Sequence, residues 1–79
     1  MGEDLSGLGT ESLVVTRRDA VAIVTLNRPH KRNALDDGMV LGLERIARGL
    51  PDDVRALVIA AEGPHFCAGL DLAELTERD

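Results

Sequence analysis

The first half of the chain carries two short runs in which β-branched and apolar residues predominate. Leu13–Arg17 is the first run and Val21–Asn27 the second, with Arg18-Asp19 between them. Two such runs separated by a short polar turn are typical of a β-hairpin. Alternate residues of the second run point to opposite faces of a sheet, and both sets are largely apolar. We therefore expect a hairpin whose second strand is covered on both faces. Pro29 should end that strand, because proline cannot donate to a ladder.

After the hairpin, apolar residues recur at helical spacing. They are Met39, Leu43, Ile46 and Leu50. This spacing predicts one apolar stripe along a helix that runs to about Gly49. Asp36 or Asp37 is expected to cap its N-terminus, where an acid also suits the helix dipole. Glu44 and Arg48 are spaced as a surface ion pair.

A third apolar run, Val54–Ala60, predicts a buried strand that ends at Glu62-Gly63-Pro64. Leu70–Arg78 again has helical spacing. The predicted order is strand, strand, helix, strand, loop, helix, in which the crossover through the helix makes a βαβ unit. The fold class expected is therefore α/β. Residues 1–11 contain three glycines and show no period, so we interpret them as a flexible leader.

The composition fits a small globular protein without disulfides. The 79 residues are 44% apolar with one aromatic residue, so aliphatic side chains must form the core. A single cysteine and two lone histidines predict neither a disulfide nor a metal site. Nine Lys and Arg against fourteen Asp and Glu leave a net charge of −5, which argues against nucleic-acid or membrane partners. With no basic run ahead of an apolar stretch, and no apolar run long enough to span a bilayer, we expect a cytoplasmic protein.

The stretch Pro64–Leu72 carries the most chemical information. A turn there leads through small residues to the expected start of a helix. Helix N-termini have unsatisfied N–H groups and a positive partial charge, and Gly69 would let a ligand approach the backbone closely. The N–H of Leu70 could then point at an oxygen that becomes negative, as a thioester carbonyl does on forming an enolate. The alternative is an ordinary strand-to-helix turn in which the glycine serves close packing.

Three segments taken in order resemble the crotonase (enoyl-CoA hydratase/isomerase) family. They are Leu26-Asn27-Arg28-Pro29 with Lys31–Leu35, then Asp53–Ile59, and finally Phe66–Leu72. The resemblance covers residues 13–77 and only the N-terminal portion of a family member. It implies the start of a crotonase-like ββα spiral fold, so that residues 12–79 would form an incomplete domain.

The resemblance also implies site residues. The backbone N–H of Leu70 would be one of two oxyanion donors. Substrate contacts would come from Lys31, Arg32, Ala34, Ala68 and Gly69. The two cations would lie near the coenzyme A phosphates and the backbone of Ala34 beside the pantetheine. For either cation taken singly, a solvated loop is an equal interpretation, and Arg28 at the strand end can be purely structural.

The function implied is that of an acyl-CoA-processing enzyme, in the first place an enoyl-CoA hydratase of fatty acid metabolism. The coenzyme A thioester would be the substrate, with no separate cofactor. A crotonase-family isomerase is the alternative within the family. An alternative of another class is a non-catalytic, CoA-binding or structural fragment that acts only with the rest of the chain or a partner. The family places its catalytic acids beyond this chain, so the chain alone should be inactive. It also implies a homotrimer or hexamer.

Overall fold

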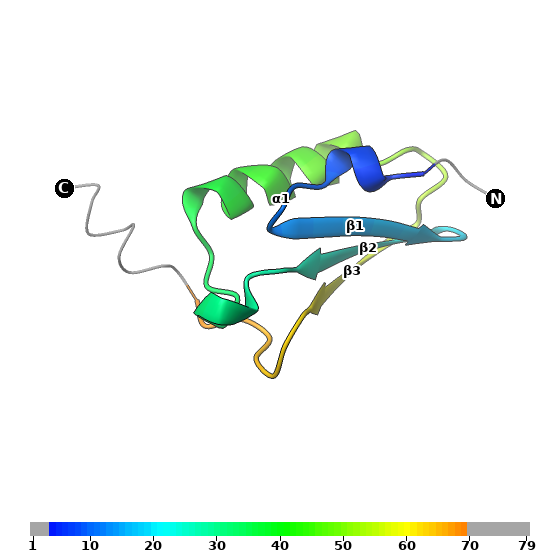
Figure 1. The fold of residues 1–79 in the computed structure, drawn as a ribbon. Helices are drawn as coiled ribbons and strands as arrows, with labels where there is room; N and C mark the ends of the chain where they lie inside the picture. The colour runs from blue at the N-terminus through cyan, green and yellow to red at the C-terminus, as the bar shows by residue number, and fades with distance from the viewer. Residues whose placement is uncertain (1–3, 70–79) are drawn as a thin grey trace.

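The computed structural model describes residues 4–69, which form a three-stranded sheet with a helix over one face (Figure 1). The elements in chain order are the short 3-10 helix η1 (Ser6–Leu8), β1 (Leu13–Arg18), β2 (Val21–Leu26), the 3-10 helix η2 (Pro29–Lys31), α1 (Asp37–Gly49) and β3 (Ala56–Ala61). The strands lie in the order β1-β2-β3, with the first pair antiparallel and the second parallel. The predicted α/β class and the order strand, strand, helix, strand are confirmed. The helix expected over Leu70–Arg78 lies outside the described residues.

The β1–β2 hairpin closes through a two-residue turn at Asp19 and Ala20. Arg18 pairs with Val21, so β1 extends one residue further than the sequence predicted. Asp19 has a φ of 54°, in the left-handed region that tight hairpin turns use and that aspartate tolerates better than most residues. Its carbonyl accepts a hydrogen bond from Arg17 Nε at 2.8 Å. The hairpin is thus confirmed, with its turn shifted by one residue.

The helix α1 begins and ends where the sequence indicated. The Asp36 side chain caps it, because Oδ1 accepts the Met39 N–H at 2.8 Å. Glu44 and Arg48 form the predicted ion pair at 3.3 Å. Both side chains are mostly exposed, so this pair contributes only a few tenths of a kcal/mol. No helix within residues 4–69 is long and apolar enough to cross a membrane.

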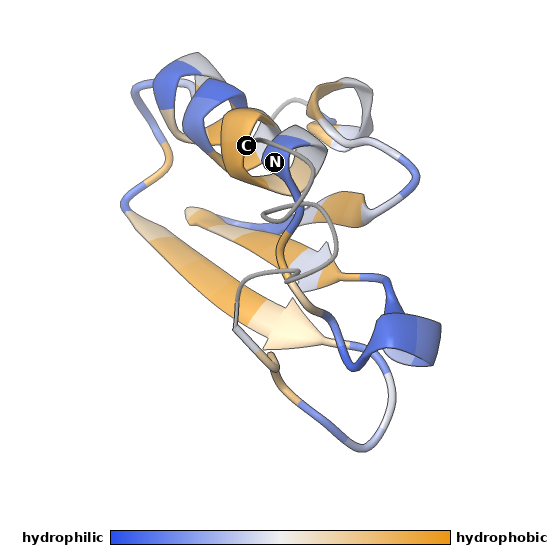
Figure 2. Cartoon of the chain, turned by 90° about the vertical axis from the view of Figure 1, so that its left-hand side faces the viewer, coloured by the Kyte–Doolittle hydropathy of each residue, from blue (hydrophilic) through white to orange (hydrophobic). Residues whose placement is uncertain are grey.

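The core lies between α1 and one face of the sheet (Figure 2). Its buried side chains are Leu5, Leu13, Val15, Ala22, Val24, Leu26, Met39 and Ile46. The members from β2 alternate along the strand, as the period of a strand requires. Its other face, which carries Val21, Ile23 and Thr25, is only half-buried. Of the two covered faces expected for this strand, one is therefore observed in the part of the chain that the structure describes.

Part of the segment 1–11, which the sequence suggested to be a flexible leader, packs against the core in the described structure. Leu5 is buried in the core, and Leu8 packs against it at the edge. A Cβ built on Gly49 would lie 3.0 Å from Leu8 Cδ2, so this leucine rests on the last turn of α1. Leu5, which precedes η1, and Leu8, which ends it, are too few to produce a period in the sequence. Their burial nevertheless ties the segment down.

The strand β3 differs from its prediction at its start and in its burial. It runs from Ala56 to Ala61, because Val54 still belongs to a turn in which its N–H bonds to Pro51 O. Val58 and Ile59 point to opposite faces and are 47% and 46% exposed. The buried strand that the sequence predicted is therefore an edge strand of the described sheet, in which Leu57 and Ala61 pack partly against the core while Val58 and Ile59 are about half exposed.

An ion pair joins β1 to the connection that leads into β3. Arg17 Nη2 lies 2.8 Å from Asp53 Oδ2, with the arginine side chain 8% exposed and the carboxylate 62% exposed. Arg17 Nη1 is also buried, without a hydrogen-bond partner among the described residues. The hydrogen bond from Arg17 holds the pKa of Asp53 below its usual range. This lowered pKa makes the pair a pH-dependent contact.

We expect Asp53→Asn to remove a stabilisation that is present near neutral pH and absent in acid. A carboxyl whose folded-state pKa is lowered stabilises the fold above its unfolded pKa, and the contribution is lost as the pH falls through the folded value. The difference in unfolding free energy between wild type and variant should therefore shrink as the pH falls below about 4. Urea unfolding at several pH values measures it, with the neighbouring exposed Asp52→Asn as the matched control. A difference that persists unchanged at low pH would contradict the assignment.

Candidate functional site

The chain after β2 folds into a compact turn, here called the first loop (residues 27–35). The carbonyl of Arg28 accepts the N–H of Lys31 at 2.9 Å and that of Asn33 at 2.8 Å. Arg32 and Asn33 follow with φ values of 52° and 58°. Two successive residues in the left-handed region reverse the chain within a few positions. Without a glycine this conformation costs energy, which contacts elsewhere must offset.

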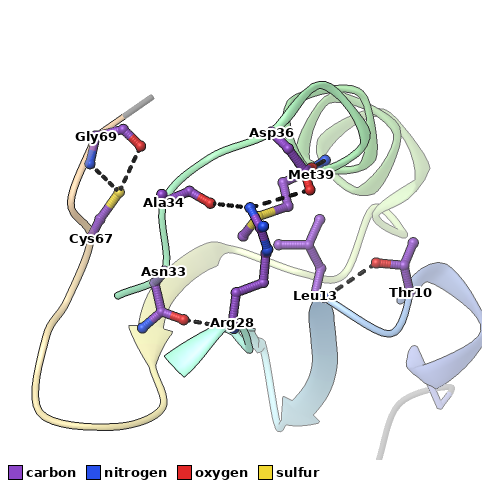
Figure 3. A network of polar contacts seen from close by, with 9 residues as sticks. All are labelled: Thr10, Leu13, Arg28, Asn33, Ala34, Asp36, Met39, Cys67 and Gly69. Atoms are coloured by element: carbon purple, nitrogen blue, oxygen red, sulfur yellow. Dashed lines mark hydrogen bonds and ion pairs between the residues drawn. The ribbon is translucent and has the colours of Figure 1, made fainter. Parts of the chain in front are cut away.

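Arg28 ties the first loop to the start of α1 (Figure 3). Its Nη1 donates to Ala34 O at 2.7 Å and lies 3.2 Å from Asp36 Oδ2. The same nitrogen lies 4.0 Å from Met39 Sδ. The side chain is only 13% exposed, so its charge is directed into the protein. The structural interpretation of Arg28 is confirmed.

The chain after β3 returns alongside the first loop; this segment is here called the second loop (residues 62–69). Ala68 N–H donates to Arg32 O at 3.0 Å, and Leu35 N–H donates to Gly69 O at 2.7 Å. Within the second loop, Gly69 N–H contacts Cys67 Sγ at 3.4 Å. Two segments that stood out separately in the sequence are therefore hydrogen-bonded neighbours in space.

The predicted substrate contacts fall into two groups in the structure. Lys31 and Arg32 are both exposed, on the outer side of the first loop. Ala34 is half-buried, and its backbone is engaged: its N–H donates to Lys31 O at 3.0 Å and its carbonyl accepts from Arg28. Ala68 and Gly69 are exposed on the second loop. The five residues thus lie on two paired loops, and Leu70 lies outside the described residues.

The residue that the sequence analysis missed is Asn33. It is completely buried, and its Nδ2 donates to Glu62 O at 2.8 Å and His65 O at 2.9 Å. Its Oδ1 accepts the Arg28 N–H at 2.7 Å. One signal was available: asparagine is among the few residues that adopt a left-handed conformation readily, and it stands at the end of a tight turn.

No group of three or more His, Cys, Asp or Glu side chains within residues 4–69 is arranged to hold a metal ion. His30 and His65 are both exposed, one on each loop. Cys67 is a free thiol of intermediate exposure. In the described part of the site, the groups available to bind a ligand are therefore backbone N–H and C=O groups and the two exposed cations.

A glycine at the base of the second loop allows the two loops to approach. Gly63 has a φ of +84°, and a Cβ built on it would lie 3.0 Å from Pro29 Cβ. We expect Gly63→Ala to destabilise the fold by about 1–2 kcal/mol, because alanine is strained at positive φ and would press on the proline. Urea unfolding measures this loss. Gly7→Ala is the control, since no atom lies within 4 Å of the added carbon. Equal stability of the two variants would contradict the expectation.

A sequence model described as Enoyl-CoA hydratase/isomerase matches residues 16–79. The 2,3-dehydroadipyl-CoA hydratase of Escherichia coli (strain K12) is 38% identical over 69 residues, which are 85% of this chain and 27% of that protein. Human enoyl-CoA delta isomerase 2 is 32% identical over 77 residues, covering 96% of this chain and 20% of the isomerase. The chain thus spans about a quarter of the length of the curated relatives that it matches.

Solved structures give the same result. A Thermobifida fusca YX protein in complex with acetoacetyl-CoA superposes with a TM-score of 0.76 at 42% identity, over 87% of this chain and 26% of that one. An enoyl-CoA hydratase from Mycobacterium tuberculosis H37Rv superposes with a TM-score of 0.77 at 34% identity, over 86% and 32% of the two chains. The chain therefore belongs to the enoyl-CoA hydratase/isomerase family, and its sheet and helix are an N-terminal portion of the crotonase fold.

Proposed function

We propose that this chain contributes the coenzyme A-binding loop and one oxyanion donor to an enzyme that hydrates an enoyl-CoA. The observation that carries the proposal is the pairing of the two loops through the bonds from Ala68 to Arg32 and from Leu35 to Gly69. This pairing brings exposed cations close to a backbone segment suited to a thioester carbonyl. A relative bound to acetoacetyl-CoA and a second structure of it bound to CoA support this ligand class.

The oxyanion donor is proposed to be the N–H of Leu70. This N–H belongs to the same peptide group as the Gly69 carbonyl, which Leu35 N–H holds at 2.7 Å. The C=O and N–H of a trans peptide point in opposite directions in one plane. In this proposal the held Gly69 carbonyl would set the direction of that N–H, and a pre-oriented donor stabilises developing negative charge without reorganisation during the reaction. The second donor of the oxyanion hole would come from beyond this chain.

The coenzyme A moiety is proposed to lie along the first loop. The exposed side chains of Lys31 and Arg32 suit the phosphates, since nothing in the described structure buries them. The carbonyl of Ala34 already accepts one bond from Arg28, and a carbonyl has a second lone pair that a pantetheine amide could use. Ala68 and Gly69 would face the thioester. The thioester is the substrate in this proposal, and no separate cofactor takes part.

Hydration is preferred to double-bond isomerisation because most of the relatives described by activity are hydratases. General acid and base groups are not assigned to this chain, since in the family they lie further along the sequence. The proposal places the enzyme in the cytoplasm, as a homotrimer or hexamer.

A second candidate is a non-catalytic fragment that acts only with a companion polypeptide. The exposure of Val58 and Ile59 on β3 favours it, because a companion polypeptide could cover these apolar side chains. In this candidate the chain alone binds or assembles but does not turn over substrate.

The test compares two samples. One is the 79-residue chain, and the other is a hybrid domain in which this chain replaces the matching segment of the Thermobifida fusca relative. Hydration of crotonyl-CoA is followed by loss of the absorbance of the conjugated thioester. We expect turnover by the hybrid domain and none by the chain alone. A folded hybrid that binds acetoacetyl-CoA without turnover would support the non-catalytic candidate. A gain of absorbance with a 3-enoyl-CoA would indicate the isomerase instead.

A further inference from the structure

A buried asparagine is the main link between the two loops. Asn33 is 0% exposed and is the only buried polar residue within residues 4–69. The side-chain amide has two N–H donors and an oxygen acceptor, and all of them are used. Both donors go to carbonyls of the second loop, at Glu62 and His65, over distances of 2.8 and 2.9 Å.

The same side chain also fixes the first loop to itself. Asn33 Oδ1 accepts the Arg28 N–H at 2.7 Å, and the Asn33 N–H donates to Arg28 O at 2.8 Å. Asn33 and Arg28 are thus joined by a pair of bonds that closes the loop around η2. A left-handed backbone at φ 58° aims the side chain toward the second loop. Asparagine meets both requirements, because it tolerates this φ and carries donors and an acceptor on one short side chain.

The hydrogen bonds of Asn33 lie close to the two backbone hydrogen bonds that pair the loops in the proposed site. Its neighbour Arg32 accepts from Ala68, and Leu35 donates to Gly69 O. If the Asn33 donors are lost, the carbonyls of Glu62 and His65 lose their partner in a part-buried location, which is unfavourable. The second loop can then shift relative to the first, and the two backbone bonds shift with it.

We propose that Asn33 is a positioning residue. It sets the distance between the first loop, which is proposed to bind coenzyme A, and the Gly69 carbonyl at the end of the second loop. The inference rests on the proposed function for its catalytic meaning. Asn33 touches no substrate in this proposal. It acts through the first loop, which carries Lys31 and Arg32, and through the second loop, which ends in the carbonyl that shares a peptide with Leu70.

The test uses two variants that separate the contributions of the side chain. Asn33→Asp keeps the acceptor for the Arg28 N–H and loses both donors. Asn33→Gly keeps the left-handed backbone and loses all three side-chain bonds. The matched control is Asn27→Asp, which removes an asparagine-to-carbonyl bond of 3.3 Å to Glu11 that does not join the loops.

The deciding measurement is amide hydrogen exchange in the full 79-residue chain. We expect both Asn33 variants to raise exchange at the Ala68 and Leu35 amides by about tenfold or more, the size expected for losing buried hydrogen bonds. Exchange in the β1–β2 ladder should stay at the wild-type rate, as should all sites in Asn27→Asp. If the Ala68 and Leu35 amides of the Asn33 variants exchange at the wild-type rate, the inference is overturned. An equal rise in the β1–β2 ladder would also overturn it, because that is the pattern of a merely structural residue.

Kinetics of the hybrid domain separate this inference from the proposed function. We expect Asn33→Asp to lower kcat more than it raises KM for crotonyl-CoA, because the misplaced donor affects the transition state most. A KM effect alone would overturn the positioning role while leaving the hydratase proposal intact. A wild-type hybrid without turnover would refute the hydratase proposal, and the exchange result would still decide whether Asn33 holds the loops together.

Discussion

Replacing Leu70 by proline is expected to lower kcat of the hybrid domain by about 10²–10³-fold, the loss seen when one oxyanion donor is removed. Proline has no backbone N–H, so the substitution deletes the proposed donor directly. The KM for crotonyl-CoA should rise much less, because the ground-state carbonyl of the substrate carries less charge than the enolate. Steady-state hydration of crotonyl-CoA measures the loss in kcat.

The matched control for this prediction is Leu70→Ala, which retains the N–H and shortens only the side chain. We expect it to keep most of the activity. Circular dichroism and thermal melting of both variants show whether the fold is preserved. Turnover of the proline variant equal to that of the alanine variant would show that the Leu70 N–H is not an oxyanion donor.

The second large effect is expected in the core, where Leu13→Ala should cost about 2–5 kcal/mol of unfolding free energy. Leu13, the first residue of β1, is 0% exposed, and its side chain lies against Gly42 of α1. A chain of this size buries a limited apolar area, so such a loss is a large share of its total stability. Urea unfolding measures it. Leu41→Ala is the control, because Leu41 is 66% exposed and its removal should change stability by no more than about 0.5 kcal/mol.

A second substitution tests whether the loss arises from the space that Leu13 fills. A Cβ built on Gly42 would lie 2.7 Å from Leu13 Cδ1, so Gly42→Ala crowds the wild-type core. In the Leu13→Ala background the added methyl enters vacated space, whereas the helix propensity of alanine acts equally in both backgrounds and cancels in the comparison. The double-mutant cycle should therefore show a favourable coupling. Additive effects of the two changes would contradict this packing.

Local signals in the sequence were sufficient for the β1–β2 hairpin and for α1. The hairpin follows from two β-branched runs around Asp19, and the helix from the Asp36 cap and the spacing of Met39 and Ile46. Each of these signals involves residues close together in the chain. The segments that carry the family resemblance could also be recognised, because each consists of a few consecutive residues.

The sequence did not reveal the contacts that join the two loops. Asn33 bonds to residues 29 and 32 positions away, and no periodicity or motif length connects such positions. Gly63 against Pro29 is a contact of the same kind. The burial of Leu5 was missed because two leucines, Leu5 and Leu8, among glycines and polar residues are too few to show a period. The exposure of β3 was not predicted because its apolar composition shows only that the strand is suited to burial. It does not show whether residues 4–69 contain the elements that would cover it.

The parallel pairing of β2 with β3 has a consequence for the order of folding events. The β1–β2 hairpin is local and can form within microseconds. Pairing β2 with β3 must first close a loop that contains η2 and α1, so it carries a larger entropic barrier. The first and second loops meet only after that closure. We therefore expect the hairpin to form early, and the second loop to be among the last of the described residues to reach its native arrangement.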